Sequence, residues 1–210
     1  MRKIRTVMFD LGGVIMTLDP QEAIRRFKAL GLEDAERQLD SYCQKGIFGD
    51  LENGLISAET FQQEISKMIG RSVSFEECRH AWLGYMKELP ERNIQLLKTL
   101  KAKGYRLLLL SNTNPFMTSW MRTTPLLDLM DKCYLSYEMK MMKPNELVFR
   151  HVLSEEKSFP YEILFLDDGP RNVAAASQLG MNTICPENGE DWTAKVLEKL
   201  NIENQSLMNI

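Results

Sequence analysis

The sequence predicts an α/β protein with a doubly wound parallel sheet and a small helical cap inserted after the first strand. Short, continuous apolar runs recur along the chain, as expected for parallel strands that helices cover on both faces. Amphipathic stretches separate most of these runs and favour helices between the strands. One segment, residues 19–88, departs from this rhythm because it has helical periodicity but no strand-like run.

Four apolar runs are expected to be the buried strands. They are Thr6–Phe9, Leu107–Leu110, Ile163–Leu166 and Thr183–Cys185 with its neighbours. Three further stretches have helical spacing, and two of them end at a glycine, which commonly stops a helix. These are Pro90–Lys103, Asn145–Leu153 and Pro170–Leu179. In such a sheet, ligands bind beyond the carboxyl ends of the strands, so polar residues at those ends are candidates for a site.

The departing segment is expected to form several short amphipathic helices. They are Gln21–Leu30, Asp34–Cys43, Ala58–Met68 and Phe75–Tyr85. We therefore expect a catalytic α/β core made of residues 1–18 and 89–210, and a helical cap made of residues 19–88. Aromatic residues of the cap either shape a substrate pocket or pack in its interior, and their helical spacing favours packing. These aromatic residues are Phe48, Phe61 and Trp82.

The composition excludes several classes of protein. The chain has 210 residues and a formal net charge of −3, which gives no general attraction to nucleic acid or to an anionic membrane. Its four cysteines are far apart with no CxxC pair, and there are only two histidines, so we expect no zinc site. Scattered thiols, and the lack of any apolar stretch near the ~20 residues of a membrane span, favour a cytoplasmic protein.

Asp10 follows the first apolar strand and precedes two glycines, in the run Phe-Asp-Leu-Gly-Gly-Val. Glycine permits backbone shapes and close ligand approach that other residues forbid. A carboxylate at this position can attack phosphorus or bind a hard cation. The alternative interpretation is an aspartate that caps a turn.

Two further polar segments have a chemistry that suits phosphate. Ser111 and Asn112 open the run Ser-Asn-Thr-Asn after four leucines, where side chains and backbone N–H groups can bind phosphate oxygens. Lys143 precedes Pro144, which favours extended backbone, and its ammonium can neutralise phosphate charge from a fixed position. The alternatives are an ordinary loop for the first segment and a solvated surface lysine for the second.

Asp167 and Asp168 stand together at the end of an apolar strand. Two adjacent acids at the end of a buried strand cost free energy unless a cation or hydrogen bonds compensate them. Magnesium prefers oxygen ligands, often one or two carboxylates with phosphate and waters, and Asp10 and Asp168 can supply these two. The alternative is a helix N-cap with an acidic first turn.

The four motifs, in this order, closely resemble those of the haloacid dehalogenase superfamily, from Thr6 to about Pro186. Within it, Phe-Asp-Leu-Gly-Gly-Val, Leu-Ser-Asn-Thr-Asn, Met-Lys-Pro and Leu-Asp-Asp are most similar to bacterial sugar-phosphate phosphatases of the α-glucose-1-phosphate phosphatase type. The cap segment Leu51–Phe61 also resembles that group. The resemblance implies a Mg²⁺-dependent hydrolase of phosphoric monoesters that acts on a small phosphorylated metabolite. The pattern is specific for the superfamily and much less specific for the substrate.

The resemblance also implies roles for individual residues. Asp10 attacks phosphorus and forms an aspartyl-phosphate, which water then hydrolyses. Ser111 binds the transferring phosphoryl group, helped by backbone N–H groups such as that of Asn112. Lys143 orients Asp10 and offsets negative charge, so Asp10, Ser111 and Lys143 are the expected catalytic residues. Phosphoryl transfer needs mainly positioning and charge stabilisation, which these groups provide.

The same resemblance implies a magnesium site. Asp10, Asp168 and the backbone carbonyl of Gly12 are the expected ligands. Asp167 is expected to support these ligands through contacts with the protein rather than to bind the ion itself.

One position departs from the usual pattern of the superfamily. Most of its phosphatases carry a second aspartate two residues after the nucleophile, which protonates the leaving group and then activates water, whereas this chain has Gly12. Such acid–base catalysis typically contributes ~10²–10⁴-fold. The sugar-phosphate branch also has glycine there, so the departure does not imply inactivity. Candidates for the substitute are Glu138, Asp50 and Glu52, although an ordinary surface acid is the commoner role for each.

Two other functions stay open at this point. A 2-haloacid dehalogenase would use Asp10 to attack carbon without a metal; the missing second aspartate favours it, and the acid pair at 167–168 argues against it. A degenerate member that binds a phosphorylated ligand without catalysis is supported only by Gly12. We expect no nucleic-acid or membrane partner, and either a monomer or a homodimer.

Overall fold

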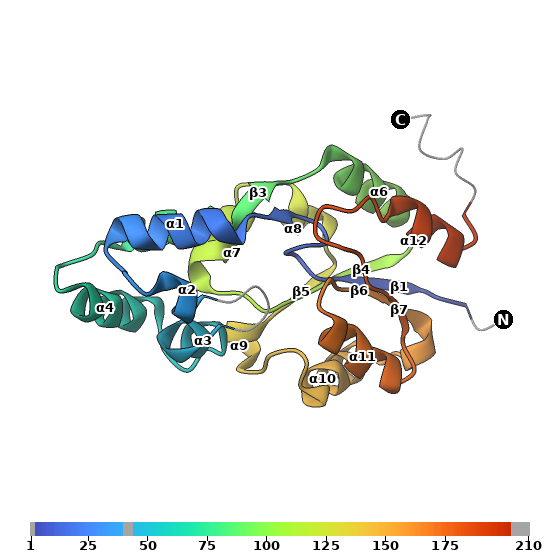
Figure 1. Cartoon of the computed structure of the whole chain (residues 1–210). Helices are drawn as coiled ribbons and strands as arrows, with labels where there is room; N and C mark the ends of the chain where they lie inside the picture. The colour runs from blue at the N-terminus through green and yellow to red at the C-terminus, as the bar shows by residue number, and fades with distance from the viewer. Residues whose placement is uncertain (1–2, 40–43, 203–210) are drawn as a thin grey trace.

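A five-stranded parallel sheet forms the centre of the computed structural model, which describes residues 3–39 and 44–202. The strand order is β5-β4-β1-β6-β7 (Figure 1). The strands are β1 (Thr6–Phe9), β4 (Arg106–Ser111), β5 (Lys132–Leu135), β6 (Ile163–Leu166) and β7 (Asn182–Ile184). The chain passes from β1 to β4 and β5 on one side, and then to β6 and β7 on the other. The order therefore reverses at β1, and the sheet is doubly wound.

The predicted fold class is confirmed, with differences in individual strands. β1 and β6 have the predicted bounds, and β4 extends the predicted Leu107–Leu110 at both ends. β7 ends at Ile184, so the predicted Cys185 lies in the loop that follows. β5 is not predicted, because it is an edge strand whose first two residues are half-buried and include a lysine.

Helices cover both faces of the sheet (Figure 1). Successive strand residues point to opposite faces, so Val7 and Phe9 pack with α6 and α12, whereas Met8 packs with α10 and α11. The bounds are α6 (Glu91–Ala102), α10 (Glu146–Glu156), α11 (Pro170–Gln178) and α12 (Thr193–Lys199). The first three match predicted helices within a few residues, and α12 is not predicted. Burial on both faces explains why the strands are continuous apolar runs.

The remaining core elements are short. They are α7 (Pro115–Met121), α8 (Leu126–Leu129), α9 (Ser136–Met139) and the 3₁₀ turn η2 (Pro160–Glu162). Across the described part of the chain, no helix combines the length and the apolar character needed to cross a membrane.

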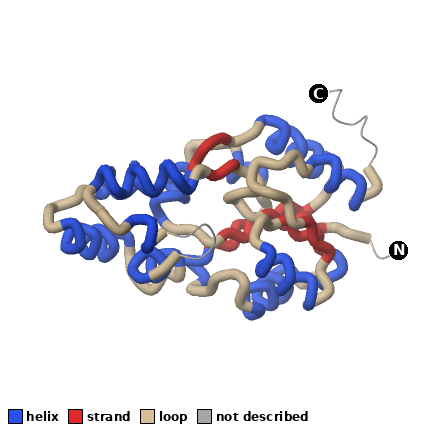
Figure 2. The backbone as a smooth tube through the Cα atoms, in the orientation of Figure 1, coloured by secondary structure: helices blue, strands red, loops and turns tan. Residues whose placement is uncertain are grey.

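Five helices lie together beyond the carboxyl ends of the strands (Figures 1 and 2). They are α1 (Pro20–Leu30), α2 (Ala35–Gln38), α3 (Gly46–Glu52), α4 (Ala58–Ile69) and α5 (Phe75–Trp82), followed by the 3₁₀ turn η1 (Leu83–Tyr85). Aromatic rings fill their interior, with neighbouring ring centroids 5.1 to 5.9 Å apart. These rings belong to Phe27, Phe48, Phe61 and Trp82. Phe48 and Phe61 are fully buried, so the favoured packing role is confirmed for both.

The cap helices differ from the prediction at two places. The predicted helix Asp34–Cys43 is wrong in extent, since α2 has four residues and residues 40–43 lie outside the described part. α3 is not predicted, because its sequence Gly-Ile-Phe-Gly-Asp-Leu-Glu contains two glycines, which are poor helix formers. Its buried Phe48 and Leu51 anchor it instead, an example of tertiary packing overriding local propensity.

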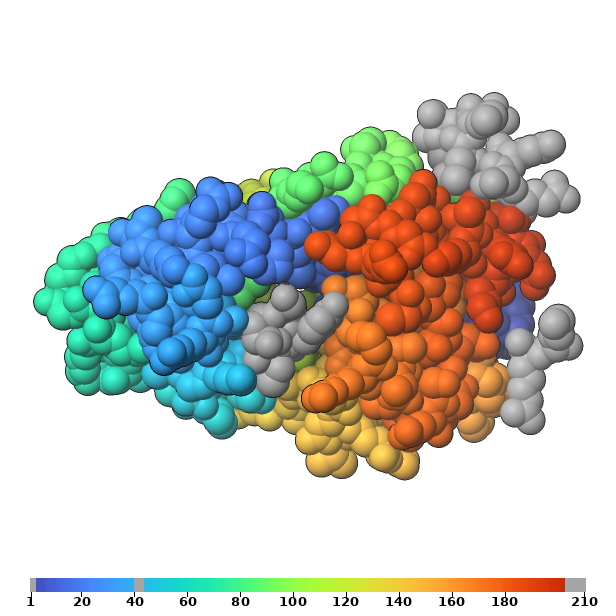
Figure 3. Space-filling model, viewed as in Figure 1, coloured from blue at the N-terminus to red at the C-terminus, as the bar shows by residue number. Residues whose placement is uncertain are grey.

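A two-stranded pairing joins the two parts of the molecule. β2 (Thr17–Leu18) and β3 (Met86–Glu88) pair antiparallel where the chain enters and leaves the helical part. The two crossings therefore lie side by side. In the space-filling view, the light-blue to teal part of the chain lies at one end of the molecule and the orange to red part at the other (Figure 3). The boundaries at 18/19 and 88/89 stay a prediction.

Candidate active site

Asp10 lies at the carboxyl edge of the sheet, directly after β1. Its backbone N–H donates to the Leu166 carbonyl at 2.8 Å, so the central strand pairing fixes its position. Its Oδ1 atom accepts hydrogen bonds from Leu11 N at 2.7 Å and from Lys143 Nζ at 3.0 Å. Burial raises the pKa of Asp10 to about 6, although the nearby Lys143 ammonium opposes this shift. The carboxylate is thus oriented through one oxygen, and no hydrogen bond from a described residue reaches the other.

Lys143 is buried and directs its ammonium entirely at the protein. Its Nζ atom lies 3.0 Å from Asp10 Oδ1, 2.5 Å from Asp167 Oδ2 and 2.9 Å from the Leu110 carbonyl. Burial alone would lower the pKa of Lys143, but the two carboxylates outweigh it and raise the pKa above its ordinary value. Lys143 is therefore a fixed positive charge beside Asp10.

The side chain of Asn112 holds Lys143 in place. Lys143 N donates to Asn112 Oδ1 at 2.9 Å, and Asn112 Nδ2 donates to the Lys143 carbonyl at 3.0 Å. This reciprocal pair uses the amide oxygen and one of the two amide N–H donors of Asn112. The predicted contact of the Asn112 backbone N–H with phosphate stays a prediction.

Asp167 is the other partner of Lys143. It is fully buried, and its Oδ1 atom accepts hydrogen bonds from Gly169 N and Asn172 Nδ2, both at 2.8 Å. Lys143 donates to the second oxygen, so both oxygens of the Asp167 carboxylate are hydrogen-bonded to the protein. The predicted supporting position of Asp167 agrees with these contacts, whereas the part played by Asn172 is not predicted.

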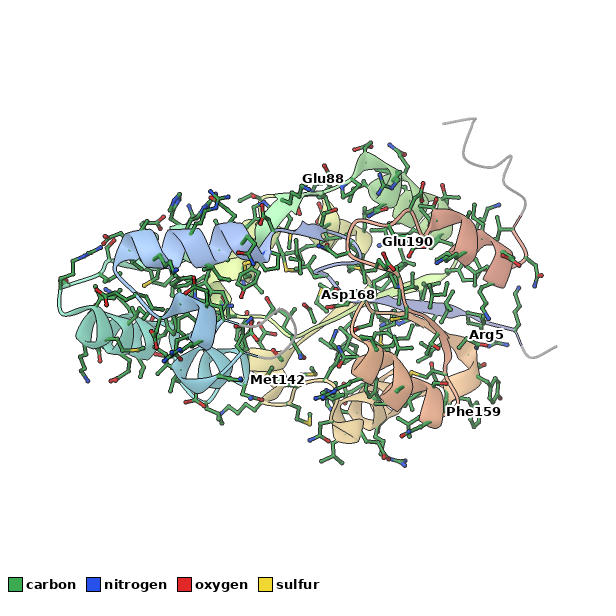
Figure 4. All side chains as sticks on the ribbon, in the orientation of Figure 1. Arg5, Glu88, Met142, Phe159, Asp168 and Glu190 are labelled. Atoms are coloured by element: carbon green, nitrogen blue, oxygen red, sulfur yellow. The ribbon has the colours of Figure 1, made fainter. Side chains whose placement is uncertain are left out.

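Asp168, which lies near the centre of the molecule (Figure 4), forms a cluster of three acids with Asp10 and Asp167. Oxygen atoms of Asp10, Asp167 and Asp168 lie within 4.8 Å of one another, and Asp168 forms no ion pair with a described residue. Burial raises the pKa of Asp168 to about 7, and the charges of Asp10 and Asp167 raise it as well. A divalent cation would offset this accumulation of negative charge, and carboxylate oxygens are its preferred ligands. The donor set therefore fits Mg²⁺.

Gly13 allows Asp168 to approach the loop after β1. Its φ angle is +75°, and a Cβ atom at this position would lie 2.1 Å from Asp168 Oδ2. Only glycine accommodates both the left-handed backbone and the close carboxylate. The two glycines after Leu11 therefore differ, because a Cβ on Gly12 would meet only the flexible end of Leu18, at 3.0 Å.

A cleft between the sheet and the helical part contains about 680 Å³ of space, part of it open to solvent. Every site residue predicted from the sequence lines it: Asp10, Gly12, Ser111, Asn112, Lys143 and Asp168. Ser111 ends β4 and is buried, and its hydroxyl lies 3.4 Å from the Asn112 carbonyl, too far for a strong hydrogen bond. It can turn to a ligand at little cost. The structure brings the predicted residues together, and their individual roles stay predictions.

Comparison with known proteins identifies the family. A family model described as a haloacid dehalogenase-like hydrolase matches residues 4–180. The chain belongs to this family. The resemblance found in the sequence motifs is thereby confirmed, and so is the classification as a hydrolase.

Relatives of this haloacid dehalogenase-like hydrolase include a phosphatase. D-ribitol-5-phosphate phosphatase of Bacteroides thetaiotaomicron is 40% identical over 205 residues, which cover 94% of this chain and 99% of the relative. A solved HAD-like family hydrolase of Porphyromonas gingivalis is 41% identical, with a TM-score of 0.89 over 95% of this chain and 99% of that one. A HAD family enzyme of B. thetaiotaomicron, in complex with magnesium and inorganic phosphate, is 35% identical, with a TM-score of 0.85 over 91% and 98%. These relatives support the predicted phosphatase.

In this haloacid dehalogenase-like hydrolase, the cap also contributes a carboxyl group to the cleft. Glu52, the last residue of α3, is buried and lines the cleft together with Asp10. Burial raises the pKa of Glu52 to about 8, and the negative charge of Asp10 adds to this rise. The Asn114 amide opposes the rise in pKa; it lies close to the carboxyl group but outside good hydrogen-bond geometry. At neutral pH, Glu52 therefore carries a proton.

The other cap and loop candidates differ from Glu52 in position. Asp50 and Glu138 do not line the cleft in the described part of the chain, and Glu138 is exposed. Trp82 has both of the roles considered for it, since it is packed in the aromatic interior and also lines the cleft. The sequence does not indicate which of Glu52 and Asp50 reaches the cleft, because the packing of α3 determines which side chain is buried there.

Proposed function

We propose that this protein is a magnesium-dependent phosphatase that hydrolyses a small phosphomonoester, a sugar or sugar-alcohol phosphate, through an aspartyl-phosphate on Asp10. The environment of Asp10 carries the proposal: Lys143 holds one of its oxygens, and Asp168 lies beside it without a cationic partner among the described residues. A carboxylate that only caps a turn would have no use for a buried ammonium and a second buried acid. The 40% identity to a D-ribitol-5-phosphate phosphatase supports the same reaction class.

The proposed chemistry follows from the positions of the side chains. A carboxylate oxygen of Asp10 forms a bond to phosphorus while the bond from phosphorus to the ester oxygen breaks. The Ser111 hydroxyl and the backbone N–H of Asn112 donate to the transferring phosphoryl oxygens. Lys143 keeps Asp10 ionised and oriented. Water then attacks phosphorus, and phosphate leaves with regeneration of the Asp10 carboxylate.

Asp10, Asp168 and the carbonyl of Gly12 would hold magnesium at this site. When bound, it offsets the negative charge of the phosphoryl group and of the two acids. The structure of a 35% identical relative with magnesium and inorganic phosphate supports this cofactor.

The cap side of the cleft favours a substrate with hydroxyl groups. Trp82 lines the cleft, and its buried Nε1–H finds no acceptor among the described residues. A buried donor without an acceptor costs about 1–3 kcal/mol, so a substrate oxygen that reached this N–H would bind more tightly. Gln44 and Tyr85, hydrogen-bonded to each other at 3.1 Å, add further polar groups to the same side. This lining suits a sugar or polyol chain better than an apolar ester.

The two alternatives from the sequence have weaker support. A dehalogenase that works without a metal gains nothing from placing the half-buried Asp168 beside Asp10, because an acid there without a cationic partner costs stability. A non-catalytic phosphate binder would not need the Lys143 ammonium against Asp10. A cytoplasmic location and a monomeric or homodimeric state stay predictions from the sequence.

A phosphate-release screen tests the proposal. Purified protein with Mg²⁺ is assayed against D-ribitol 5-phosphate, pentose and hexose phosphates, nucleotides and flavin mononucleotide, with Asp10→Asn as the control. We expect turnover of one or more sugar or polyol phosphates, no turnover by D10N and none with a chelator present. Chloride release from a 2-haloacid without Mg²⁺, or no turnover of any phosphate ester by the wild type, would contradict it.

A further inference from the structure

Gly12 leaves the proposed reaction without an acid at the position where most phosphatases of the superfamily carry one. An alkoxide is a poor leaving group at neutral pH, so a proton must reach the ester oxygen as its bond to phosphorus breaks. Among the residues that the structure describes, the titratable side chains that line the cleft are Asp10, Glu52, Tyr85, Lys143 and Asp168. The source of the proton is expected among them.

Most of these groups are committed to other contacts. Asp10 is the nucleophile, and Asp168 is the carboxylate suited to the metal. All three donor positions of Lys143 are directed at Asp10, Asp167 and the Leu110 carbonyl. Tyr85 is hydrogen-bonded to Gln44. Glu52 is the remaining carboxyl group, and no described cationic side chain forms an ion pair with it.

The backbone of Glu52 is anchored to the core rather than only to the cap. The Ser136 hydroxyl donates a hydrogen bond to the Glu52 carbonyl at 2.6 Å. The same hydroxyl accepts a hydrogen bond at 2.9 Å from the backbone N–H of Thr113, which lies two residues after Ser111. Two residues beyond Glu52, a Cβ atom on Gly54 would lie 2.0 Å from the Tyr137 carbonyl, so the chain there is pressed against α9. These contacts fix Glu52 relative to the phosphate-binding loop after β4.

The surroundings of Glu52 keep it protonated. Its side chain is buried where it lines the cleft, with the Asn114 amide as a polar neighbour. The charged groups that share the cleft are Asp10, Lys143 and Asp168, and the negative charge of Asp10 disfavours ionisation of Glu52 further. A neutral carboxylic acid in this position is a hydrogen-bond donor toward the cleft.

We propose that Glu52 is the proton donor to the leaving group, in place of the acid that Gly12 cannot supply. The inference rests on the phosphatase function proposed above. As the Asp10 oxygen bonds to phosphorus, the ester oxygen keeps the electron pair of the broken bond and takes the Glu52 proton. The products of this step are the alcohol, the aspartyl-phosphate and the Glu52 carboxylate. That carboxylate then accepts a proton from the attacking water, which restores the acid as phosphate is released.

Two esters with different leaving groups test this assignment in Glu52→Gln. D-Ribitol 5-phosphate needs a proton on its leaving oxygen, whereas p-nitrophenolate is stable without one. We expect E52Q to lose about 10²–10⁴-fold in kcat on the alkyl ester. With p-nitrophenyl phosphate, we expect a rapid burst of one equivalent of p-nitrophenolate, followed by slow turnover, because only the hydrolysis of the aspartyl-phosphate still needs a base.

Matched variants and a pH profile complete the test. Asp50→Asn and Glu138→Gln change acids outside the cleft and are expected to leave both esters unaffected. In the wild type, turnover of the alkyl ester should fall as the pH rises through the pKa of Glu52, and E52Q should lack this limb. If E52Q folds poorly, judged by its melting temperature, the wild-type profile with both esters decides alone.

Three results would overturn the assignment. The first is an equal loss in E52Q of the burst rate and of alkyl-ester turnover, and the second is unchanged alkyl-ester turnover in E52Q. The third is a Tyr85→Phe variant that loses alkyl-ester turnover but keeps the p-nitrophenolate burst, in place of E52Q. A wild type that hydrolyses no ester of the phosphate-release panel would contradict the phosphatase function itself, which separates the two failures.

Discussion

The Lys143 ammonium lies 2.5 Å from Asp167 Oδ2, and this contact joins the loop after β6 to the nucleophile. Asp167 does not line the cleft, and its other oxygen is held by Gly169 N and by the Asn172 amide. Because Lys143 also contacts Asp10 at 3.0 Å, a residue outside the cleft sets the position of the charge beside the nucleophile. Asp167 thus acts on catalysis through Lys143.

Asp167→Asn is therefore expected to lower kcat without changing the need for metal. The loss should be about 10–100-fold, the usual effect of removing a partner that orients an active group. The apparent affinity for Mg²⁺ should change much less than kcat, because the Asp167 carboxylate is engaged by Lys143, Gly169 and Asn172. Steady-state assays across a Mg²⁺ titration separate the two effects. A large rise in the Mg²⁺ requirement of D167N would place Asp167 among the ligands and contradict this account.

Asp168→Asn should show the opposite behaviour, and melting curves can detect it without turnover. Burial raises the pKa of Asp10 to about 6 and that of Asp168 to about 7. Between about pH 4 and these raised pKa values, both carboxyls are therefore protonated in the folded protein and ionised in the unfolded chain. Their contribution therefore makes the metal-free protein less stable as the pH rises from about 4 through about 7.

Magnesium should remove much of this cost. At a concentration 100 times its Kd, a ligand that binds only the folded state stabilises it by about 2.7 kcal/mol. We expect Mg²⁺ to raise the melting temperature of the wild type at pH 7.5, but much less at pH 5, where the acids are protonated. D168N should lose most of the gain, and D167N should keep it. An equal Mg²⁺ response in D168N and the wild type would exclude Asp168 as a ligand.

The adjacent glycines Gly12 and Gly13 offer a matched pair of substitutions. Gly13→Ala imposes a side chain on a φ of +75° and overlaps Asp168 Oδ2, which costs of the order of 1–3 kcal/mol in backbone strain alone. Gly12→Ala meets only the movable end of Leu18. We expect G13A to lose activity and Mg²⁺-dependent stabilisation, and G12A to keep both. Equal activity of the two variants would show that the approach of Asp168 to Gly13 is not needed.

The sequence predicts the strands well because their environment leaves a local signal. β1 and β6 are buried on every residue, so they appear as unbroken apolar runs with clear ends. β5 lies at the sheet edge and begins with Lys132, so its run is too short to separate from a loop. α3 is invisible for a related reason, because its two glycines oppose a helix that only its tertiary contacts stabilise.

The site is predicted in part for a topological reason. Parallel strands bring their carboxyl ends to one edge, so Asp10, Ser111 and Asp168 are expected to meet there from their positions alone. What a side chain does at that edge depends on neighbours that no spacing reveals. The Asn112 amide forms two hydrogen bonds with the backbone of Lys143, and the Ser136 hydroxyl donates to the Glu52 carbonyl.

A last expectation concerns stability away from the cleft. Glu156, at the end of α10, has a nearly buried side chain that accepts hydrogen bonds from Arg106 and, at 2.7 Å, from the Tyr134 hydroxyl. Burial alone would raise the pKa of Glu156, but these hydrogen bonds outweigh it and lower the pKa below its ordinary value. The ionised carboxylate thus stabilises the fold at pH values above the pKa of Glu156 in the unfolded chain. This contribution is lost as the pH falls through the lower pKa of the folded state.

Tyr134→Phe removes one hydrogen bond to this carboxylate and should cost about 1.5–3 kcal/mol at pH 7. The cost should shrink as the pH falls and Glu156 becomes protonated. Glu146→Gln is the matched control, because its ion pair with Arg150 is exposed and should contribute no more than about 0.5 kcal/mol. Urea unfolding of the three proteins at pH 7 and pH 4 measures these differences. A Y134F cost that equals that of E146Q, or that grows in acid, would mean that Glu156 is not held as an ionised partner of Tyr134.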